Sequence, residues 1–208
     1  KIIFGRNHYL DVYDIENDEL KSVITRVGGN IENIWTLNND FIVVFTEDLY
    51  GEFRNSFRLL DKDVNLIRIL RGHEDYINDV KILNDKNILT CSNDRTIRLW
   101  DNEGIEILTL NDHTESVTGI EVFSNEIFLS YSRDRTIRFW DNDGNLQNTL
   151  IAHNDIINGV KILKDTDVVS YSKDHTLKLW NFMQHKKNEC NSHKGLINGY
   201  IKLSDTKI

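Results

Sequence analysis

The sequence predicts an all-β fold, a β-propeller built from repeated four-stranded antiparallel sheets, and three observations carry this prediction. Tryptophan recurs at intervals of 40 residues, at Trp100, Trp140 and Trp180. Histidine recurs at the same interval, at His73, His113, His153 and His193. Between these markers the chain repeats short runs rich in Ile, Val, Leu, Thr and aromatic residues, which favour strands. A fixed period of a few tens of residues is the signature of a repeat architecture.

Residues 72–111 form the clearest unit. Its four runs predict strands at residues 77–83, 88–92, 96–101 and 105–110, which we call strands a, b, c and d, with the same letters for every unit. The runs alternate in polarity and are separated by Asn, Asp and Gly, which are typical of turns.

Two further units, at residues 112–151 and 152–190, repeat this pattern. Between strands c and d, Asn102-Glu103-Gly104 and Asn142-Asp143-Gly144 supply residues that tolerate positive φ, as a tight hairpin requires. One such sheet cannot bury both of its faces alone. We therefore expect the sheets to pack radially against one another, as in a propeller.

Residues 31–71 form a degenerate unit. Leu60 stands where the other units have tryptophan, and Gly28-Gly29 precede the unit without a histidine. Extra residues from Leu49 to Asn55 interrupt the pattern, and this insertion is either an exposed binding loop or packed against its own sheet. The aromatic residues that make it a candidate are Tyr50, Phe53 and Phe57.

The chain is predicted to be one partial propeller domain over residues 1–208. Residues 1–25 match strands b, c and d of another unit, and residues 191–208 stop after a strand a near Ile197 to Leu203. A seven-bladed ring with about 40 residues in each blade needs about 280 residues. Because the chain also opens on Lys1 rather than methionine, we expect a fragment that holds most of a seven-bladed ring.

Composition excludes several classes of protein. No apolar run approaches the ~20 residues that a membrane span needs, so we expect no membrane partner. A net charge of -8 argues against the broad basic surface of a general nucleic-acid binder. Cys91 and Cys190 lie far apart without CxxC spacing, which favours free thiols in a reducing, cytoplasmic environment over a disulfide or a zinc site.

Several repeated residues resemble the WD40 repeat: the Gly72-His73 pair, the S-x-S-x-D-x-T run, and the Trp100-Asp101 and Trp140-Asp141 dipeptides. The I-N-G-V-x-I-L-x-D and S-Y-S-x-D-x-T segments are similar to WD repeats from bacterial proteins. In that family, a loop histidine, a strand b hydroxyl, an aspartate and the strand c tryptophan form a buried tetrad. The resemblance implies three tetrads: His73, Thr90, Asp94, Trp100; His113, Ser130, Asp134, Trp140; and His153, Ser170, Asp174, Trp180. It leaves open whether the hydroxyls two residues further on take part instead, namely Ser92, Ser132 and Ser172.

The resemblance also implies a function, because WD40 propellers bind partner proteins or peptides through the d–a and b–c loops of one face. In this chain the candidate partner-binding residues are Tyr76, Asn93, Arg95, Arg133, Arg135, Ile156, Lys173 and His175. Their cations form a locally basic arc that suits an acidic or phosphorylated partner. The alternative is that Arg95 and Arg135 pair with neighbouring carboxylates at little energetic gain. Those carboxylates belong to Glu74, Asp75, Glu115 and Asp155. The cations on strand c are expected to be solvated edge residues: Arg98, Arg138 and Lys178.

Chemistry is not expected of this chain, so we predict no enzyme, no metal and no cofactor. Each histidine lacks a second ligand at metal spacing, and three equivalent Ser, His and Asp sets indicate a folding role rather than one active site. Asp141 begins a calcium-like loop, but Ala152 stands where its glutamate belongs. Two alternatives stay open: an enzyme or small-ligand binder with a site in the central channel, and, less favoured by the charge, a nucleic-acid-associated propeller.

Overall fold

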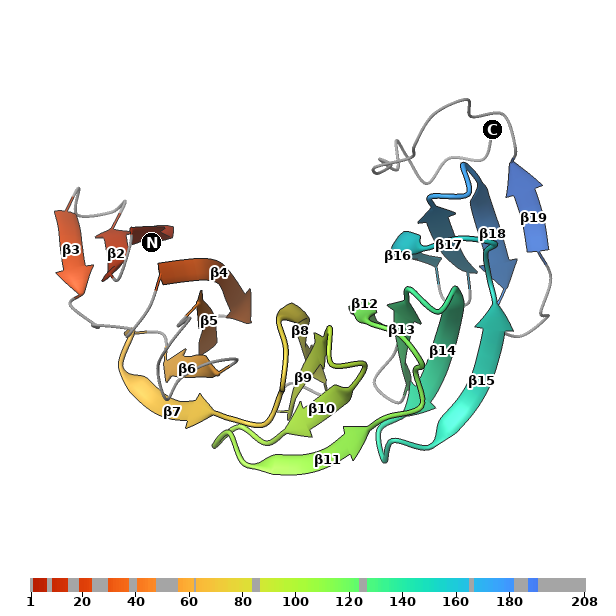
Figure 1. Cartoon of the computed structure of the whole chain (residues 1–208). Helices are drawn as coiled ribbons and strands as arrows, with labels where there is room; N and C mark the ends of the chain where they lie inside the picture. The colour runs from red at the N-terminus through yellow and green to blue at the C-terminus, as the bar shows by residue number, and fades with distance from the viewer. Residues whose placement is uncertain are drawn as a thin grey trace. The chain divides into compact units, whose positions relative to one another are not determined.

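The fold is all-β, as predicted, in a computed structural model of the chain (Figure 1). Every regular element among the described residues is a strand, and each strand pairs antiparallel with a chain neighbour. Within that described part, no helix is long and apolar enough to cross a membrane. The described residues are 2–6, 9–14, 19–23, 30–37, 41–47, 56–61, 63–83, 87–123, 127–164, 167–181 and 187–190.

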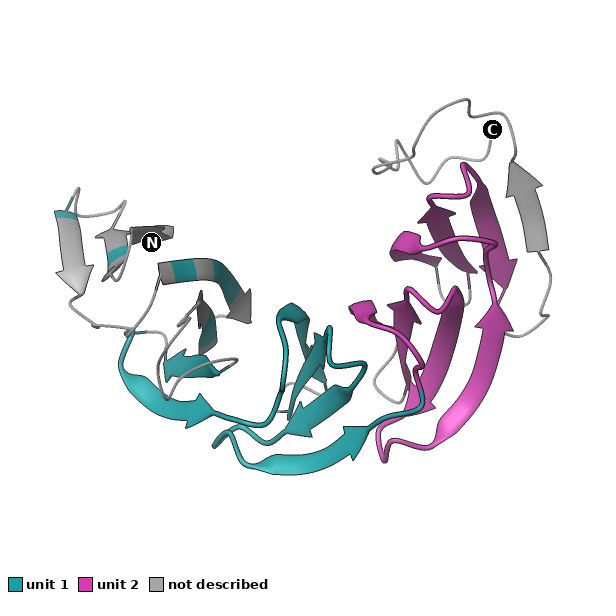
Figure 2. Cartoon of the chain, in the orientation of Figure 1, with its two compact units in different colours: residues 1–112 teal, residues 113–208 magenta. Residues whose placement is uncertain are grey.

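The chain divides into two compact units, residues 1–112 (unit 1) and residues 113–208 (unit 2), shown in Figure 2. Unit 1 contains a three-stranded sheet and two four-stranded sheets. The three-stranded sheet holds β1 (Ile2–Arg6), β2 (Tyr9–Asp14) and β3 (Glu19–Val23). The next holds β4 (Asn30–Leu37), β5 (Phe41–Glu47), β6 (Phe57–Asp61) and β7 (Leu66–Leu70). The last holds β8 (Ile77–Leu83), β9 (Asn87–Ser92), β10 (Ile97–Trp100) and β11 (Glu106–Leu110).

Unit 2 contains two four-stranded sheets with their strands in chain order. The first holds β12 (Val117–Val122), β13 (Ile127–Ser132), β14 (Thr136–Asp141) and β15 (Leu146–Ile151). The second holds β16 (Ile157–Lys164), β17 (Asp167–Ser172), β18 (Leu177–Asn181) and β19 (Lys187–Cys190). The four strands of each sheet are its strands a to d. The number of blades in a complete ring stays a prediction.

Trp100 and Trp180, both on strand c, pack against the preceding sheet of their own unit. Trp100 is 2% exposed and meets the Phe57 ring edge-on at a centroid distance of 5.5 Å. In unit 2, Trp180 lies in one core cluster with Leu129 and Phe139 of the preceding sheet. Burying an aromatic side chain of this size is a main source of stability in such a core.

Of the two alternatives for the aromatic residues of the insertion, Phe57 does not fit the exposed one. Phe57 is 1% exposed because it opens strand β6, where it packs against Trp100 of the next sheet. Tyr50 and Phe53 lie outside the described residues. Leu60, which replaces tryptophan, is fully buried with Ile42 and Val44.

The turns between strands c and d adopt the left-handed backbone that the sequence predicts. Gly104 and Gly144 have φ of 76° and 82°. Val64 holds the matching place in the degenerate unit at φ 69°, which is an outlier for a β-branched residue. Its side chain is 3% exposed and packs with Ile42 and Leu60, so packing holds the turn in this conformation.

Two glycines of strand a in unit 2 lie under tyrosine rings of strand b. Gly119 pairs with Tyr131, and Gly159 pairs with Tyr171. A Cβ atom built on Gly119 would lie 2.1 Å from the Tyr131 hydroxyl oxygen, which is far inside van der Waals contact. The matching pair in unit 1 is Asp79 and Cys91, where a small side chain replaces the ring.

Candidate functional site

A histidine, a hydroxyl, a carboxylate and an indole form one hydrogen-bonded chain in each of three sheets. In unit 1, His73 Nδ1 lies 2.7 Å from Asp94 Oδ2, and His73 Nε2 lies 2.8 Å from Thr90 Oγ1. The Trp100 indole donates to the same Thr90 oxygen over 2.9 Å. Strands b and c make the hydroxyl and the indole diagonal neighbours, since Thr90 pairs with Arg98 and Trp100 lies two residues further along strand c. The loop before strand a supplies the histidine.

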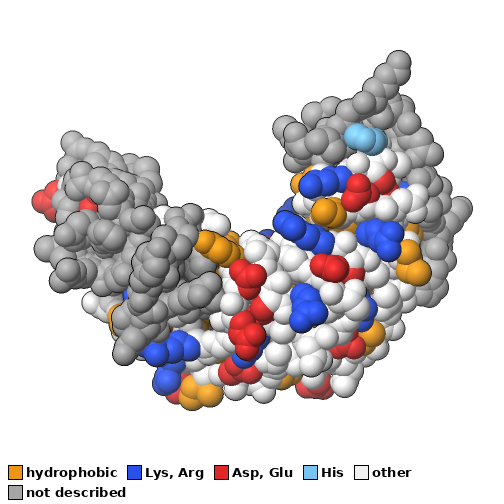
Figure 3. All heavy atoms as spheres, in the orientation of Figure 1, with side chains coloured by type: hydrophobic (Ala, Val, Ile, Leu, Met, Phe, Trp, Pro, Cys, Tyr) orange, Lys and Arg blue, Asp and Glu red, His pale blue; other side chains and the backbone are white. Residues whose placement is uncertain are grey.

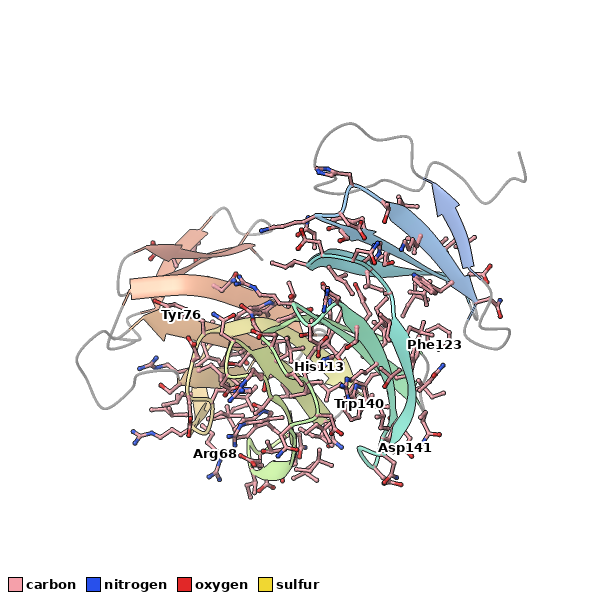
Figure 4. The ribbon with its side chains drawn as sticks, turned by 45° about the vertical axis from the view of Figure 1, so that its right-hand side comes forward. Arg68, Tyr76, His113, Phe123, Trp140 and Asp141 are labelled. Atoms are coloured by element: carbon pink, nitrogen blue, oxygen red, sulfur yellow. The ribbon has the colours of Figure 1, made fainter. Side chains whose placement is uncertain are left out.

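Unit 2 repeats this geometry twice. Around His113, the distances to Asp134 and Ser130 are 2.7 and 2.8 Å, and the Trp140 indole lies 2.9 Å from the Ser130 oxygen. Figure 4 shows His113 and Trp140 lying together. In the second sheet the corresponding distances are 3.0, 2.7 and 2.8 Å, among Asp174, His153, Ser170 and Trp180. Each of the twelve residues assigned to a tetrad thus lies in its expected set, in three separate sets of four.

The proton positions in each chain follow from the donors and acceptors. An indole can only donate, so it fixes the serine oxygen as its acceptor. The serine O–H is then free to donate to His113 Nε2, and the Nδ1–H of the same ring can donate to the Asp134 carboxylate. Every polar atom of the hydrogen-bonded chain then has a partner. Such a set can be buried without an unpaired group.

The structure also assigns the second hydroxyl. Ser92 Oγ donates to the Asp75 carbonyl at 3.0 Å and accepts the Asp94 amide, so it holds the b–c turn and does not join the tetrad. A residue that we did not assign does join: Thr96 Oγ1 donates to Asp94 Oδ1 at 2.6 Å. Thr136 and Thr176 do the same in unit 2. The recurrence of threonine two residues after each aspartate was the available signal.

The tetrad carboxylates are held ionised. Burial would by itself raise the pKa of Asp134, but hydrogen bonds from His113 and Thr136 outweigh it and leave the pKa well below its usual value. The same balance lowers the pKa of Asp94 through His73, and that of Asp174 mainly through Thr176 and the Asn154 amide.

The order of these hydrogen bonds matches that of a hydrolase triad, yet the hydroxyl is not placed to act as a nucleophile. Ser130 is 0% exposed, and its oxygen is already bonded to the Trp140 indole. A nucleophile must reach its substrate, and a donor aimed at its lone pair weakens it. The three sets therefore serve to fix the loop before strand a to strands b and c.

The calcium-like loop at Asp141 is an ordinary turn. The Asp141 carboxylate accepts hydrogen bonds from the Asp143 and Asn145 amides and from the Asn145 and Gln147 side chains, and the Asn145 side chain leads in lowering its pKa. Asp101 accepts two turn amides in the same way. Among the described residues, no cluster of three or more His, Cys, Asp or Glu is arranged to hold a metal ion.

The expectation that the strand c cations are solvated edge residues is wrong. Lys178 is 3% exposed and donates to the Ala152 carbonyl at 3.1 Å, and the Arg98 guanidinium bonds to Glu106. Strand c lies inside its sheet, so these cations are not on an edge strand. A Cβ on Gly72 would lie 2.6 Å from Arg98 Nη1, which shows how closely the loop before strand a passes the guanidinium.

The tips of the b–c turns carry two arginines and a histidine in a left-handed conformation. Arg95, Arg135 and His175 have φ of 74°, 70° and 67°, and each donates its amide to the serine three residues earlier. This is a type I turn closed by a left-handed residue, a position that favours glycine. Each of the three side chains is exposed, between an aspartate and a threonine that are both partly buried.

The exposed cations of these turns are not engaged elsewhere in the described part of the chain. There, the side chains of Arg95, Arg133, Arg135 and Lys173 make no ion pair and no hydrogen bond. The alternative in which Arg95 and Arg135 pair with the neighbouring carboxylates is therefore not seen among those residues. Figure 3 shows basic side chains at the surface among acidic ones.

The other candidate residues lie beside these turns. In unit 1, Tyr76 is 42% exposed and its carbonyl accepts the Asn93 amide, while the Asn93 side chain accepts from Asn78. In unit 2, the carbonyls of Arg135 and Ile156 accept the amides of Ala152 and Lys173. The segment at residues 152–156 thus has Arg135 on one side and Lys173 on the other.

Comparisons with known proteins agree with this geometry. The family model described as "WD domain, G-beta repeat" (WD40) matches residues 64–101, 104–141 and 144–181, together more than half of the chain. No curated protein matches. Among solved structures, the chain is similar to the WD40 beta propeller domain of Doa1, with 20% identity over 92% of this chain and 64% of that one, at a TM-score of 0.70.

The chain is also similar to the computationally designed Ika8 protein, with 19% identity over 94% of this chain and 60% of that one, at a TM-score of 0.75. The chain therefore spans less than two thirds of the length of these two structures. At such identity the likeness shows the fold alone, and one propeller fold serves many functions.

Proposed function

The chain belongs to the WD40-repeat family, and from this premise we propose that it is an interaction scaffold that binds an acidic or phosphorylated protein segment through the b–c and d–a loops of unit 2. A WD40 propeller fold supports a general role as a protein-interaction scaffold. The finer assignment depends on the surface of this chain, and above all on the turn tips at Arg135 and His175.

The observation that carries the proposal is a cation retained in an unfavourable backbone conformation. A non-glycine residue in the left-handed region is disfavoured by roughly 1–2 kcal/mol, and glycine would remove that strain. The tetrad does not need the side chain of Arg135, since Asp134 and Thr136 supply all of its contacts in this turn. Strain that serves no purpose in the fold supports a role in binding.

The exposed charges of unit 2 support an anionic partner. In unit 2 the exposed cations Arg133, Arg135 and Lys173 lie near two exposed carboxylates, of Glu115 and Asp155. Arginine binds carboxylate and phosphate groups through paired hydrogen bonds, which suits an anionic segment laid across residues 152–156. The matching turn of unit 1 has Asn93 in place of Arg133, with Glu74 and Asp75 beside it, and is less basic.

The test measures binding of a fluorescein-labelled glutamate-rich peptide, with and without one phosphoserine, by fluorescence anisotropy. Arg133→Glu combined with Lys173→Glu is expected to weaken binding by about tenfold or more, with the melting temperature nearly unchanged. Arg135→Gly keeps the turn and loses the cation, so it is expected to weaken binding while stability stays equal or rises.

The control is Lys161→Glu, which makes the same change in charge as Arg133→Glu alone but on strand a, at a lysine that contacts Glu121. Equal weakening by Lys161→Glu and by Arg133→Glu alone would mean that net charge is responsible. Unchanged affinity in the Arg133 and Lys173 variant would remove the arc as a binding surface.

A further inference from the structure

Strand β15 is an open edge with an unusual surface. It is the last strand of the β12–β15 sheet, and among the described residues it pairs with β14 alone. Leu146 is 41% exposed and Ile151 is 83% exposed. An edge strand presents a row of backbone donors and acceptors that can pair with another strand.

The other edge strands carry charges, and β15 carries none. Strand β7 contains Arg68, β11 contains Glu106, and β19 contains Lys187 and Glu189. The sequence of β15 is LQNTLI, and the uncharged run extends from Gly144 to Ala152 in a chain that is 28% charged. Charged side chains are a usual protection of edges against pairing, and β15 lacks this protection.

We propose that β15 pairs antiparallel with β15 of a second copy of this chain. Two copies with a net charge of -8 repel each other, so contact is least opposed where both surfaces are uncharged. A two-fold contact needs a surface that is complementary to itself, and a strand paired antiparallel with its own copy meets this condition.

The backbone indicates the register. The Thr149 amide donates to the Asn148 side chain at 2.8 Å and so does not point to β14. The pairing with β14 is regular from Asn148 to Ile151 and shifts at Gln147. Because backbone groups alternate in direction along a regular strand, Thr149 and Ile151 then face the open edge. With Thr149 opposite Thr149, this central pair is a hydrogen-bonded pair. The Asn148 side chain must release the Thr149 amide, so it restrains association.

The test is sedimentation equilibrium of the chain from about 1 µM to 1 mM, the range in which small interfaces associate. We expect a monomer–dimer equilibrium. Ile151→Lys is expected to raise the dissociation constant by about tenfold or more, because it places a charge on each edge at the contact. Asn148→Ala, which frees the Thr149 amide, is expected to lower it.

The matched control is Ile107→Lys on β11, where the native side chain is 49% exposed and the strand already carries a charge. This variant is expected to leave the dissociation constant unchanged, and thermal melts of both lysine variants check their folding. A chain that stays monomeric throughout would overturn the proposal. So would equal effects of the two lysine substitutions, or open-ended assemblies in place of a dimer.

Discussion

The oxygen of the Ser130 hydroxyl takes part in two hydrogen bonds of its tetrad. Its oxygen accepts from the Trp140 indole at 2.9 Å and lies 2.8 Å from His113 Nε2. Ser130→Ala removes both hydrogen bonds and leaves the indole N–H without an acceptor, in a site where serine and tryptophan are 0% and 1% exposed. Both side chains are closed to bulk solvent.

The size of the effect follows from these contacts. Two hydrogen bonds contribute about 0.5–1.5 kcal/mol each, and a buried donor left unpaired costs about 1–3 kcal/mol. Because these terms overlap, we expect the free energy of unfolding to fall by about 2–4 kcal/mol. The measurement is urea denaturation followed by far-UV circular dichroism. The Ser130→Ala variant keeps all four tryptophans of the chain.

Two comparisons separate the hydrogen bonds from packing. Ser130→Thr is expected to cost less than about 1 kcal/mol, because Thr90 makes the same two contacts in unit 1. A Trp140→Phe variant has no indole N–H that could lose its acceptor. In that variant, Ser130→Ala is therefore expected to lower the free energy of unfolding by about 1 kcal/mol less than in the wild type. If threonine proved as destabilising as alanine, or alanine cost under about 0.5 kcal/mol, the proton positions assigned to the tetrad would be wrong.

Three further outcomes are expected. Trp140→Ala is expected to lower the free energy of unfolding by about 3–5 kcal/mol, and a loss below about 1 kcal/mol would contradict the burial of the ring. Gly119→Ala is expected to cost about 1–3 kcal/mol because of the overlying Tyr131 ring; combined with Tyr131→Cys, it is expected to cost less than the sum of the two single changes. The tetrad carboxylates have a pKa below the usual 3.8, so the stability that they contribute is present above about pH 3.8 and is lost as the pH falls below it. Denaturation from pH 6 to pH 3 measures this loss, and Asp134→Asn is expected to show a shallower slope; an unchanged slope would contradict the assigned pKa.

The sequence was sufficient for features that depend on spacing. Trp140, His113 and Asp134 recur at a fixed interval, and a fixed interval places them at the same point of each sheet. The choice between Thr90 and Ser92 could not be made in this way, because residues two apart on a strand point to the same face. Only the hydrogen-bond geometry separates them.

Burial on strand c could not be read from the sequence. The alternation of Lys178 with apolar residues is typical of a strand with one solvated face. Here the strand lies within its sheet and the loop before strand a of the same sheet passes close to it, so the ammonium group reaches the Ala152 carbonyl. Val64 carried no signal at all, since a β-branched residue is among the least expected in a left-handed turn.

Within three residues, the b–c turn combines a side chain that stabilises the sheet with side chains that the fold does not use. Asp134 and Thr136 hold the sheet together, while the side chains on both sides of Asp134, at Arg133 and Arg135, make no contact with described residues through ion pairs or hydrogen bonds. Five such positions, at residues 95, 133, 135, 173 and 175, can therefore be randomised as a library with the tetrads left untouched. The same scaffold would then be open to selection for new ligands, one turn at a time.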